Sequence, residues 1–234
     1  MTVASQGDLR IEAATPTQVS ADLRCPHLVF RNVMGAEYVG ALLDYVADRH
    51  EEFRPGSMQN RETGDSFVDP KVRDCLYLKD LGVFKNPIKS LVAGISDRVL
   101  EALHLVEPEV KPREFEITAY GDGGHISDHI DVCTGAQSVR VVSCVYYFAA
   151  TPRRFSGGEL RLYGFPKRSA AGAEPPPLSF VDVQPDTDTL IVFPSWLRHK
   201  VLPVRVPSGA WADRRFTISC WIHRVGSSAG RVIP

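Results

Sequence analysis

Two histidines and one aspartate in this 234-residue chain have the types and spacing of a metal site. His129 and Asp131 form a His-x-Asp pair at the end of the segment that begins at Tyr120, whose glycines let the backbone turn sharply after an apolar stretch. His199 follows much later in the chain. Two imidazoles and one carboxylate on one face bind non-haem Fe(II) and leave coordination positions open for a co-substrate and O2. The sequence therefore predicts an Fe(II) site at His129, Asp131 and His199.

Taken alone, the His-x-Asp pair is weak evidence for a metal site. In a chain with seven histidines, a pair on the surface is the ordinary explanation. His125, four residues before His129, is a rival ligand. We interpret His125 as a residue at the rim of the cavity or an outer partner of a ligand.

The segment Arg215-Phe-Thr-Ile-Ser-Cys-Trp221 is predicted to be a strand that carries a second binding group. Alternation along a strand places Arg215, Thr217, Ser219 and Trp221 on one face and apolar residues on the other. A guanidinium that points inward needs an anion, and its planar fork binds a carboxylate bidentately with a hydroxyl beside it. Arg214 is the alternative anchor, and Arg215 could instead point to solvent or to a buried aspartate.

Short strands must hold these side chains on one face. After Pro112 the sequence changes to apolar segments separated by glycine and proline. The expected strands are 114–120, 138–150, 159–163, 178–183, 188–193, 200–206 and 215–223. Seven such strands predict a β barrel or sandwich, with helices packed outside it.

Two helices are expected before the strands. Residues 39–47 carry an amphipathic stripe with three- and four-residue spacing. A second helix is predicted to start at Asn86 as N-cap with Pro87 in the first position, and to run to Leu103. A short strand is possible at 28–33.

The chain is expected to contain one domain. Residues 1–26 are predicted to be an N-terminal arm, possibly loose, and residues 27–234 a single domain. Within it, 27–112 is the helical support and 113–225 the β core. The polar segments at 51–70 and 164–177 are predicted to be loops that form a lid over the open end of the barrel.

Composition excludes several classes of protein. With 44% hydrophobic and 24% charged residues the chain is an ordinary globular protein, and its net charge of -1 gives no electrostatic case for nucleic acid or a membrane surface. No apolar run is long enough to span a bilayer, and the N-terminus lacks the apolar core of a signal peptide. The five scattered cysteines are typical of reduced thiols, so we expect a cytoplasmic location.

Four motifs in order carry a resemblance to a known family. They are Tyr-Gly-x-Gly-Gly with His-x-Asp, Phe155-Ser-Gly-Gly-Glu-Leu160, His199-x-x-x-Pro-Val, and Arg-Phe-Thr-Ile-Ser-x-Trp. Over residues 114–223 the chain resembles the prolyl-4-hydroxylase type of iron- and 2-oxoglutarate-dependent dioxygenase. It departs from that pattern at Ile126, where the family often has an aromatic residue, and in an apparent insertion before Arg215.

The resemblance implies a mainly β fold with flanking helices around a double-stranded β-helix (jelly roll, cupin-like). It implies His129, Asp131 and His199 as iron ligands. Arg215 and Thr217 would hold the distal carboxylate of 2-oxoglutarate, with Tyr120 as a further partner. The turn at Gly157-Gly158-Glu159 is interpreted as structural.

The activity implied is hydroxylation of an unactivated C–H bond, with Fe(II), 2-oxoglutarate and O2, supported by ascorbate and releasing succinate and CO2. We favour a free amino acid or small metabolite as substrate. A prolyl or other residue in a protein or peptide is the alternative. A carboxylate-bearing substrate would need a second cation, and the candidates are Arg61, Arg73, Arg153, Arg154 and Arg198.

Two hypotheses from other classes remain. A cupin-like metalloprotein without redox chemistry, or a jelly-roll binding module without metal, would share the fold. The Arg215-x-Thr217 pair argues against both. The sequence does not predict the oligomeric state.

Overall fold

A computed structural model describes residues 16–19, 25–59, 63–132, 139–165 and 179–225. The helices are α1 (Ala36–Asp48) and α2 (Lys85–Ala102), with short 3-10 helices η1 (His50–Glu52), η2 (Gly82–Phe84) and η3 (Trp211–Asp213). The strands of the first half are β1 (Pro16–Val19), β2 (Leu28–Arg31), β3 (Arg54–Pro55), β4 (Met58–Gln59), β5 (Ser66–Phe67), β6 (Arg73–Asp74), β7 (Leu76–Leu78) and β8 (Val110–Tyr120). Those of the second half are β9 (His125–His129), β10 (Arg140–Phe148), β11 (Ser156–Gly157), β12 (Leu160–Tyr163), β13 (Phe180–Val183), β14 (Thr189–Pro194), β15 (His199–Val201), β16 (Val204–Arg205) and β17 (Arg215–Arg224).

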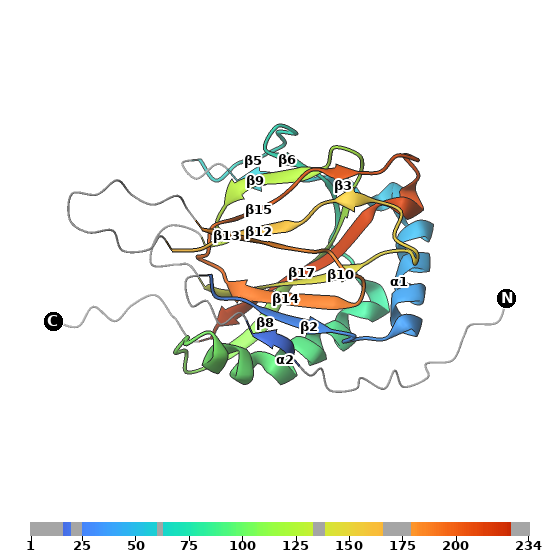
Figure 1. Ribbon diagram of the computed structural model, residues 1–234. Helices are drawn as coiled ribbons and strands as arrows, with labels where there is room; N and C mark the ends of the chain where they lie inside the picture. Colours follow the sequence, from blue (N-terminus) through green and yellow to red (C-terminus); the bar gives the residue numbers. More distant parts are fainter. Residues whose placement is uncertain (1–15, 20–24, 60–62, 133–138, 166–178, 226–234) are drawn as a thin grey trace.

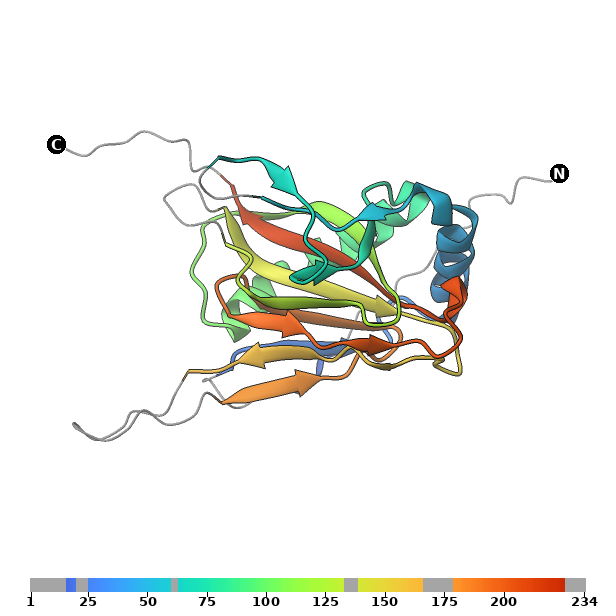
Figure 2. The same ribbon diagram turned by 90° about the horizontal axis from the view of Figure 1, so that it is seen from above.

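Two antiparallel sheets form the body of the protein. The major sheet has the strand order β1-β2-β14-β10-β17-β8-β7-β3, and the minor sheet has the order β13-β12-β15-β9-β6. Helix α2 runs along the major sheet beside β8 (Figure 1), and α1 stands at one end of the strands (Figure 2). This architecture confirms the predicted mainly β fold with a jelly-roll core and flanking helices.

The central strands of the major sheet are buried on both faces. Ile117 of β8 and Ile218 of β17 belong to the core that the helices cover, where they join Val92 of α2. The alternate residues face the minor sheet, and there Tyr120 and Tyr147 pack with apolar residues of β12, β15 and β16. Because side chains alternate along a strand, one row of each central strand stabilises the helices and the other row lines the space between the sheets.

The predicted strands of the β core are present with small shifts at their ends. The segment 200–206 is divided between β15 and β16, and residues 133–138 at the start of one predicted strand lie outside the described residues. Strand β9 was not predicted, because its sequence His-Ile-Ser-Asp-His is polar and shows no apolar alternation.

The prediction of a plain loop at 51–70 is wrong for part of that segment. Strand β3 pairs with β7 and so extends the major sheet, and β4 pairs with β5 in a small hairpin. Two-residue strands carry too little pattern to be recognised in a sequence. The other half of the predicted lid, at 164–177, lies almost entirely outside the described residues.

The predicted start of the second helix is also wrong. Helix α2 begins at Lys85, and Asn86 makes no cap because the 3-10 helix η2 leads directly into it. Phe84, at the junction, already has helical backbone angles (φ -75°, ψ -16°). Pro87 is therefore the third residue of the helix and lies in its first turn, where the backbone N–H groups have no partner within the helix.

Part of the predicted N-terminal arm belongs to the fold. Residues Pro16–Val19 form β1, which pairs antiparallel with β2 at the edge of the major sheet. The other residues before Cys25 lie outside the described part of the chain.

Two expectations from composition meet structural findings. In the described part of the chain, no helix is both long and apolar enough to cross a membrane. Four cysteines are buried and free, and the fifth, Cys133, lies outside the described residues.

A buried carboxylate ties α1 to the sheet. Asp188, just before β14, accepts hydrogen bonds from the backbone amides of Met34 (2.9 Å) and Gly35 (3.0 Å), which lead into α1. The hydroxyl of Tyr146 on β10 donates to the same carboxylate at 3.0 Å. Asp188 has a positive φ of 56°, which aspartate and asparagine tolerate better than most residues. This carboxylate replaces the side-chain cap that α1 lacks.

Replacing Asp188 by asparagine should lower the free energy of unfolding by about 1–3 kcal/mol, because an amide nitrogen would face one of these buried donors. Urea denaturation followed by circular dichroism measures the change. The control is Asp186→Asn, which removes an exposed ion pair with Arg31 and should change stability by less than about 1 kcal/mol. Equal stability of the two variants would contradict this role for Asp188.

Candidate metal centre

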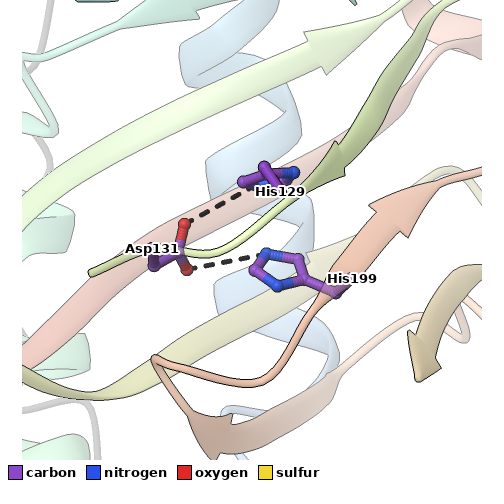
Figure 3. A group of neighbouring side chains, drawn as sticks. All are labelled: His129, Asp131 and His199. Atoms are coloured by element: carbon purple, nitrogen blue, oxygen red, sulfur yellow. Dashed lines mark ion pairs between the residues drawn. The ribbon is translucent and has the colours of Figure 1, made fainter. Parts of the chain in front are cut away.

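Pairing of β9 with β15 brings the two predicted histidine ligands together. His129 lies directly opposite His199 in the register, and their ring centroids are 4.1 Å apart. Asp131 lies just after β9, and its backbone amide donates to the carbonyl oxygen of Ser195 at 2.9 Å. One ligand atom from each of the three residues lies within 4.8 Å of the others, and the side chains converge (Figure 3).

Hydrogen bonds to the backbone fix the orientation of both imidazoles. Nδ1 of His129 lies 2.8 Å from the carbonyl oxygen of Ser127, and Nδ1 of His199 lies 2.8 Å from that of Leu197. A carbonyl only accepts, so Nδ1 carries the proton in each ring and Nε2 keeps its lone pair. Both Nε2 atoms lie 3.6 Å from an oxygen of Asp131. Burial, reinforced by the neighbouring His199, lowers the pKa of His129 to about 4, so this ring is neutral at pH 7.

Asp131 is held as a carboxylate by its surroundings. Burial alone would raise its pKa, but His199, His129 and two hydrogen-bond donors outweigh burial, so the pKa lies below its usual value. The donors are the hydroxyl of Ser143 (2.6 Å) and the indole nitrogen of Trp221 (3.0 Å), both to Oδ2. Two imidazoles whose Nε2 atoms face one oriented carboxylate fit Fe(II).

A second group of side chains lies between the sheets. Arg215 and Thr217 are each 1% exposed, and Tyr147 lies opposite Thr217 in the register. The guanidinium carbon of Arg215 lies 4.5 Å from the ring centroid of Tyr120 and 5.0 Å from that of Tyr147.

Buried polar atoms in this group lack partners among the described residues. They are Nε and Nη1 of Arg215, Oγ1 of Thr217 and Oη of Tyr147. Leaving such groups unpaired is unfavourable, and for a buried charge strongly so. The carboxylate of 2-oxoglutarate would satisfy them, so the residues fit this co-substrate.

The two rival residues lie elsewhere. Arg214 is half-buried, with its guanidinium 4.7 Å from the ring centroid of Trp211. The ring nitrogens of His125 lie 3.0 Å from the carbonyl oxygen of Gly123 and 3.2 Å from that of Lys71, and His125 is not part of the ligand group. The geometry therefore supports Arg215 over Arg214 as the anchor and His129 over His125 as the ligand.

Sequence reasoning missed three residues of the site. Tyr147 and Ser143 lie on β10, whose two faces are both buried, so polarity along the strand does not mark the face that lines the cavity. Gly158 was interpreted as part of a structural turn, and this interpretation is incomplete. A Cβ at Gly158 would lie 2.6 Å from Cδ of Arg215, so the glycine makes room for the side chain of Arg215.

Two solved structures share the fold of this chain. A prolyl-4-hydroxylase from Pseudomonas putida superposes with a TM-score of 0.59 at 21% identity, covering 86% of this chain and 93% of that one. A prolyl hydroxylase from Trichoplax adhaerens, solved with a hypoxia inducible factor peptide fragment, gives 0.56 at 16% identity, covering 84% and 83%. At these identities the likeness shows a shared fold.

Comparison of sequences shows which family the second half of the chain resembles. Residues 115–223 match the model of the 2OG-Fe(II) oxygenase superfamily. An uncharacterized PKHD-type hydroxylase of Synechocystis sp. is 33% identical over 155 residues, which is 63% of this chain. The chain spans about half the length of that relative. Residues 115–223 thus resemble the 2-oxoglutarate- and Fe(II)-dependent oxygenases in sequence, and the predicted resemblance to the prolyl-4-hydroxylase type is confirmed.

Replacing His199 by alanine should weaken iron binding by more than the roughly 10- to 100-fold that loss of an outer partner of a ligand causes. Anaerobic calorimetric titration with Fe(II) measures the affinity. His125→Ala is the matched control and should bind iron like the unmodified protein. The ligand assignment fails if the effects of the two substitutions are reversed.

Gly158→Ala should weaken the binding of 2-oxoglutarate while iron affinity is retained, because the added methyl group displaces Arg215. Titration of 2-oxoglutarate into the Fe(II) form measures this. Gly158 has a φ of +73°, so strain must be separated from displacement. Gly209→Ala is the control, since Gly209 has a φ of +63° and nothing within 4 Å of the position a Cβ would take. Equal losses of 2-oxoglutarate affinity in both variants would assign the effect to backbone strain.

Proposed function

We propose that the protein hydroxylates an unactivated C–H bond of a free amino acid or small metabolite, using Fe(II), 2-oxoglutarate and O2, with ascorbate as a supporting reductant. The observation that carries this proposal is the buried guanidinium of Arg215, of which Nε and Nη1 lack partners among the described residues. Arg215 lies on the same face of β17 as Trp221, which donates to Asp131. A metal site alone would need no such cation.

Each residue of the site has a distinct part in this proposal. Bound iron and 2-oxoglutarate supply the oxidising power, and 2-oxoglutarate leaves as succinate and CO2. Arg215 and Thr217 hold the distal carboxylate of 2-oxoglutarate, and Tyr120 and Tyr147 pack against the guanidinium. Ser143 and Trp221 keep the carboxylate of Asp131 aimed at the metal. Arg215, Thr217 and His199 are buried, which strengthens the electrostatic contacts that they make.

A prolyl residue in a peptide is the second candidate substrate. The two solved structures reported above are prolyl hydroxylases by name, and one was solved with a peptide. The non-redox alternatives lose support, because neither uses an unpaired cation at this position and the sequence matches an oxygenase superfamily.

Arg215→Ala should weaken 2-oxoglutarate binding by roughly 30- to several-thousand-fold, since a buried charged partner is lost, while iron binding stays nearly intact. Arg215→Lys should be intermediate, because a point charge replaces a fork. The metal-to-ligand charge-transfer band of the anaerobic Fe(II) form follows 2-oxoglutarate binding, and succinate release tests turnover.

Arg214→Ala is the matched control, with an arginine removed from the adjacent, half-buried position. A loss confined to Arg214→Ala would move the anchor by one residue. Unchanged affinity in both variants would refute the dioxygenase proposal for this strand.

A further inference from the structure

A polar pocket of about 390 Å³ lies beside the metal centre. Its lining residues are Ser57, Arg73, Tyr77, Lys79, Glu114, Phe115, Glu116, Arg140 and Trp221. Two of them touch the ligand Asp131: Trp221 donates to its carboxylate, and Nη1 of Arg140 donates to its carbonyl at 3.2 Å. The side chains of Trp221 and Arg140 therefore stand between this pocket and Asp131, and the volume suits a small ligand.

One pair of charges in the pocket is already matched. The guanidinium of Arg140 binds the carboxylate of Glu114 and lies 3.9 Å from the ring centroid of Trp221. Glu114 also lies 2.8 Å from Nε2 of His223. These contacts use both partners, so the pair forms a wall and offers little to a ligand.

The second pair offers groups of both signs. Nη2 of Arg73 donates to Oε1 of Glu116 at 3.1 Å, and each side chain is 20% exposed. The other hydrogen bonds of Arg73 run from Nε to the sulfur of Cys75 and from Nη1 to the carbonyl oxygen of Ser57. A guanidinium has five N–H groups, so some remain for a ligand. Oε2 of Glu116 receives no hydrogen bond from the described residues.

Position and charge single out this pair. Glu116 lies on the cavity face of β8, opposite Ser219 and on the same row as Tyr120. Lys79 adds a positive charge at the exposed end of the pocket and makes no ion pair with the described residues. Of the other arginines considered as partners for a substrate carboxylate, Arg153 and Arg198 form ion pairs outside the pocket, Arg154 is exposed, and Arg61 lies outside the described residues.

We propose that this pocket binds the charged head of a free amino acid, with the carboxylate against Arg73 and Lys79 and the ammonium against Glu116. The inference rests on the proposed function, because it concerns the substrate of the same site. A residue within a peptide has neither charge on its backbone. It would leave the remaining N–H groups of Arg73 and Oε2 of Glu116 without charged partners. Both charges of a free amino acid are matched here.

Four forms of each L-amino acid test the proposal: free, N-acetylated, C-amidated, and capped at both ends. Each is titrated calorimetrically into the anaerobic protein loaded with Fe(II) and 2-oxoglutarate, and succinate release is measured in air. At least one free amino acid should bind and stimulate succinate release. Its doubly capped form should bind at least about 10-fold more weakly, since charged hydrogen bonds are lost.

Two variants assign the contacts. Glu116→Gln should weaken the free and amidated forms by about 10- to 100-fold and leave the N-acetylated form unchanged, because that form has no ammonium. Lys79→Met should weaken the free and N-acetylated forms and leave the amide unchanged. Glu52→Gln, which alters a carboxylate paired with Arg49 outside the pocket, is the control and should change none of them.

The outcomes separate this inference from the proposed function. If 2-oxoglutarate binds but only doubly capped or peptide substrates bind and stimulate succinate release, the pocket proposal is overturned and the oxygenase proposal stands. The same holds if 2-oxoglutarate binds and no free amino acid does. If 2-oxoglutarate itself neither binds nor yields succinate, both proposals are overturned.

Discussion

A charged guanidinium in the core is the constraint on which the rest of this structure depends. Arg215 is 1% exposed, and two of its nitrogens lack partners among the described residues. Such a group is tolerated only where the surrounding packing is strong enough to hold it. The chain meets this condition by burying β10, β17 and the second half of β8 on both faces, so that the helices stabilise one side of the sheet. The other side is then free to carry polar groups that only a ligand satisfies.

The anchor and the metal centre are coupled through the strands that carry them. Strand β17 holds Arg215 at one end and, further along the same face, Trp221, whose indole donates to Asp131. Strand β10 repeats the arrangement: Tyr147 packs against the guanidinium of Arg215, and the hydroxyl of Ser143 donates to Asp131. Because residues of one row move together, a shift in register would disturb both sites at once. The major sheet therefore sets the distance between Arg215 and the two side chains that donate to Asp131.

The sequence allowed prediction of those parts of the site whose residue types are unusual. A His-x-Asp pair, a distant histidine and an arginine on an apolar strand stand out, and the fold class follows from short strands after Pro112. The register that places His129 opposite His199 could not be predicted, since β9 has no apolar alternation. Tyr147 was missed because both faces of β10 are buried. Asn86 failed as a helix cap because a preceding 3-10 turn had already set the helical backbone. In each case tertiary contacts decided what local pattern left open.

Charge balance links the buried centre to the pocket beside it. With His129 neutral, the positive charges would be those of Fe(II) and Arg215, and the negative ones those of Asp131 and the two carboxylates of 2-oxoglutarate. These charges cancel when metal and co-substrate are both bound or both absent, and they do not cancel when only one is bound, so each favours binding of the other in a medium that screens charge poorly. The next ligand to arrive meets a neutral centre. A zwitterion adds no net charge to it, and the Arg73–Glu116 pair matches its two ends without disturbing that balance.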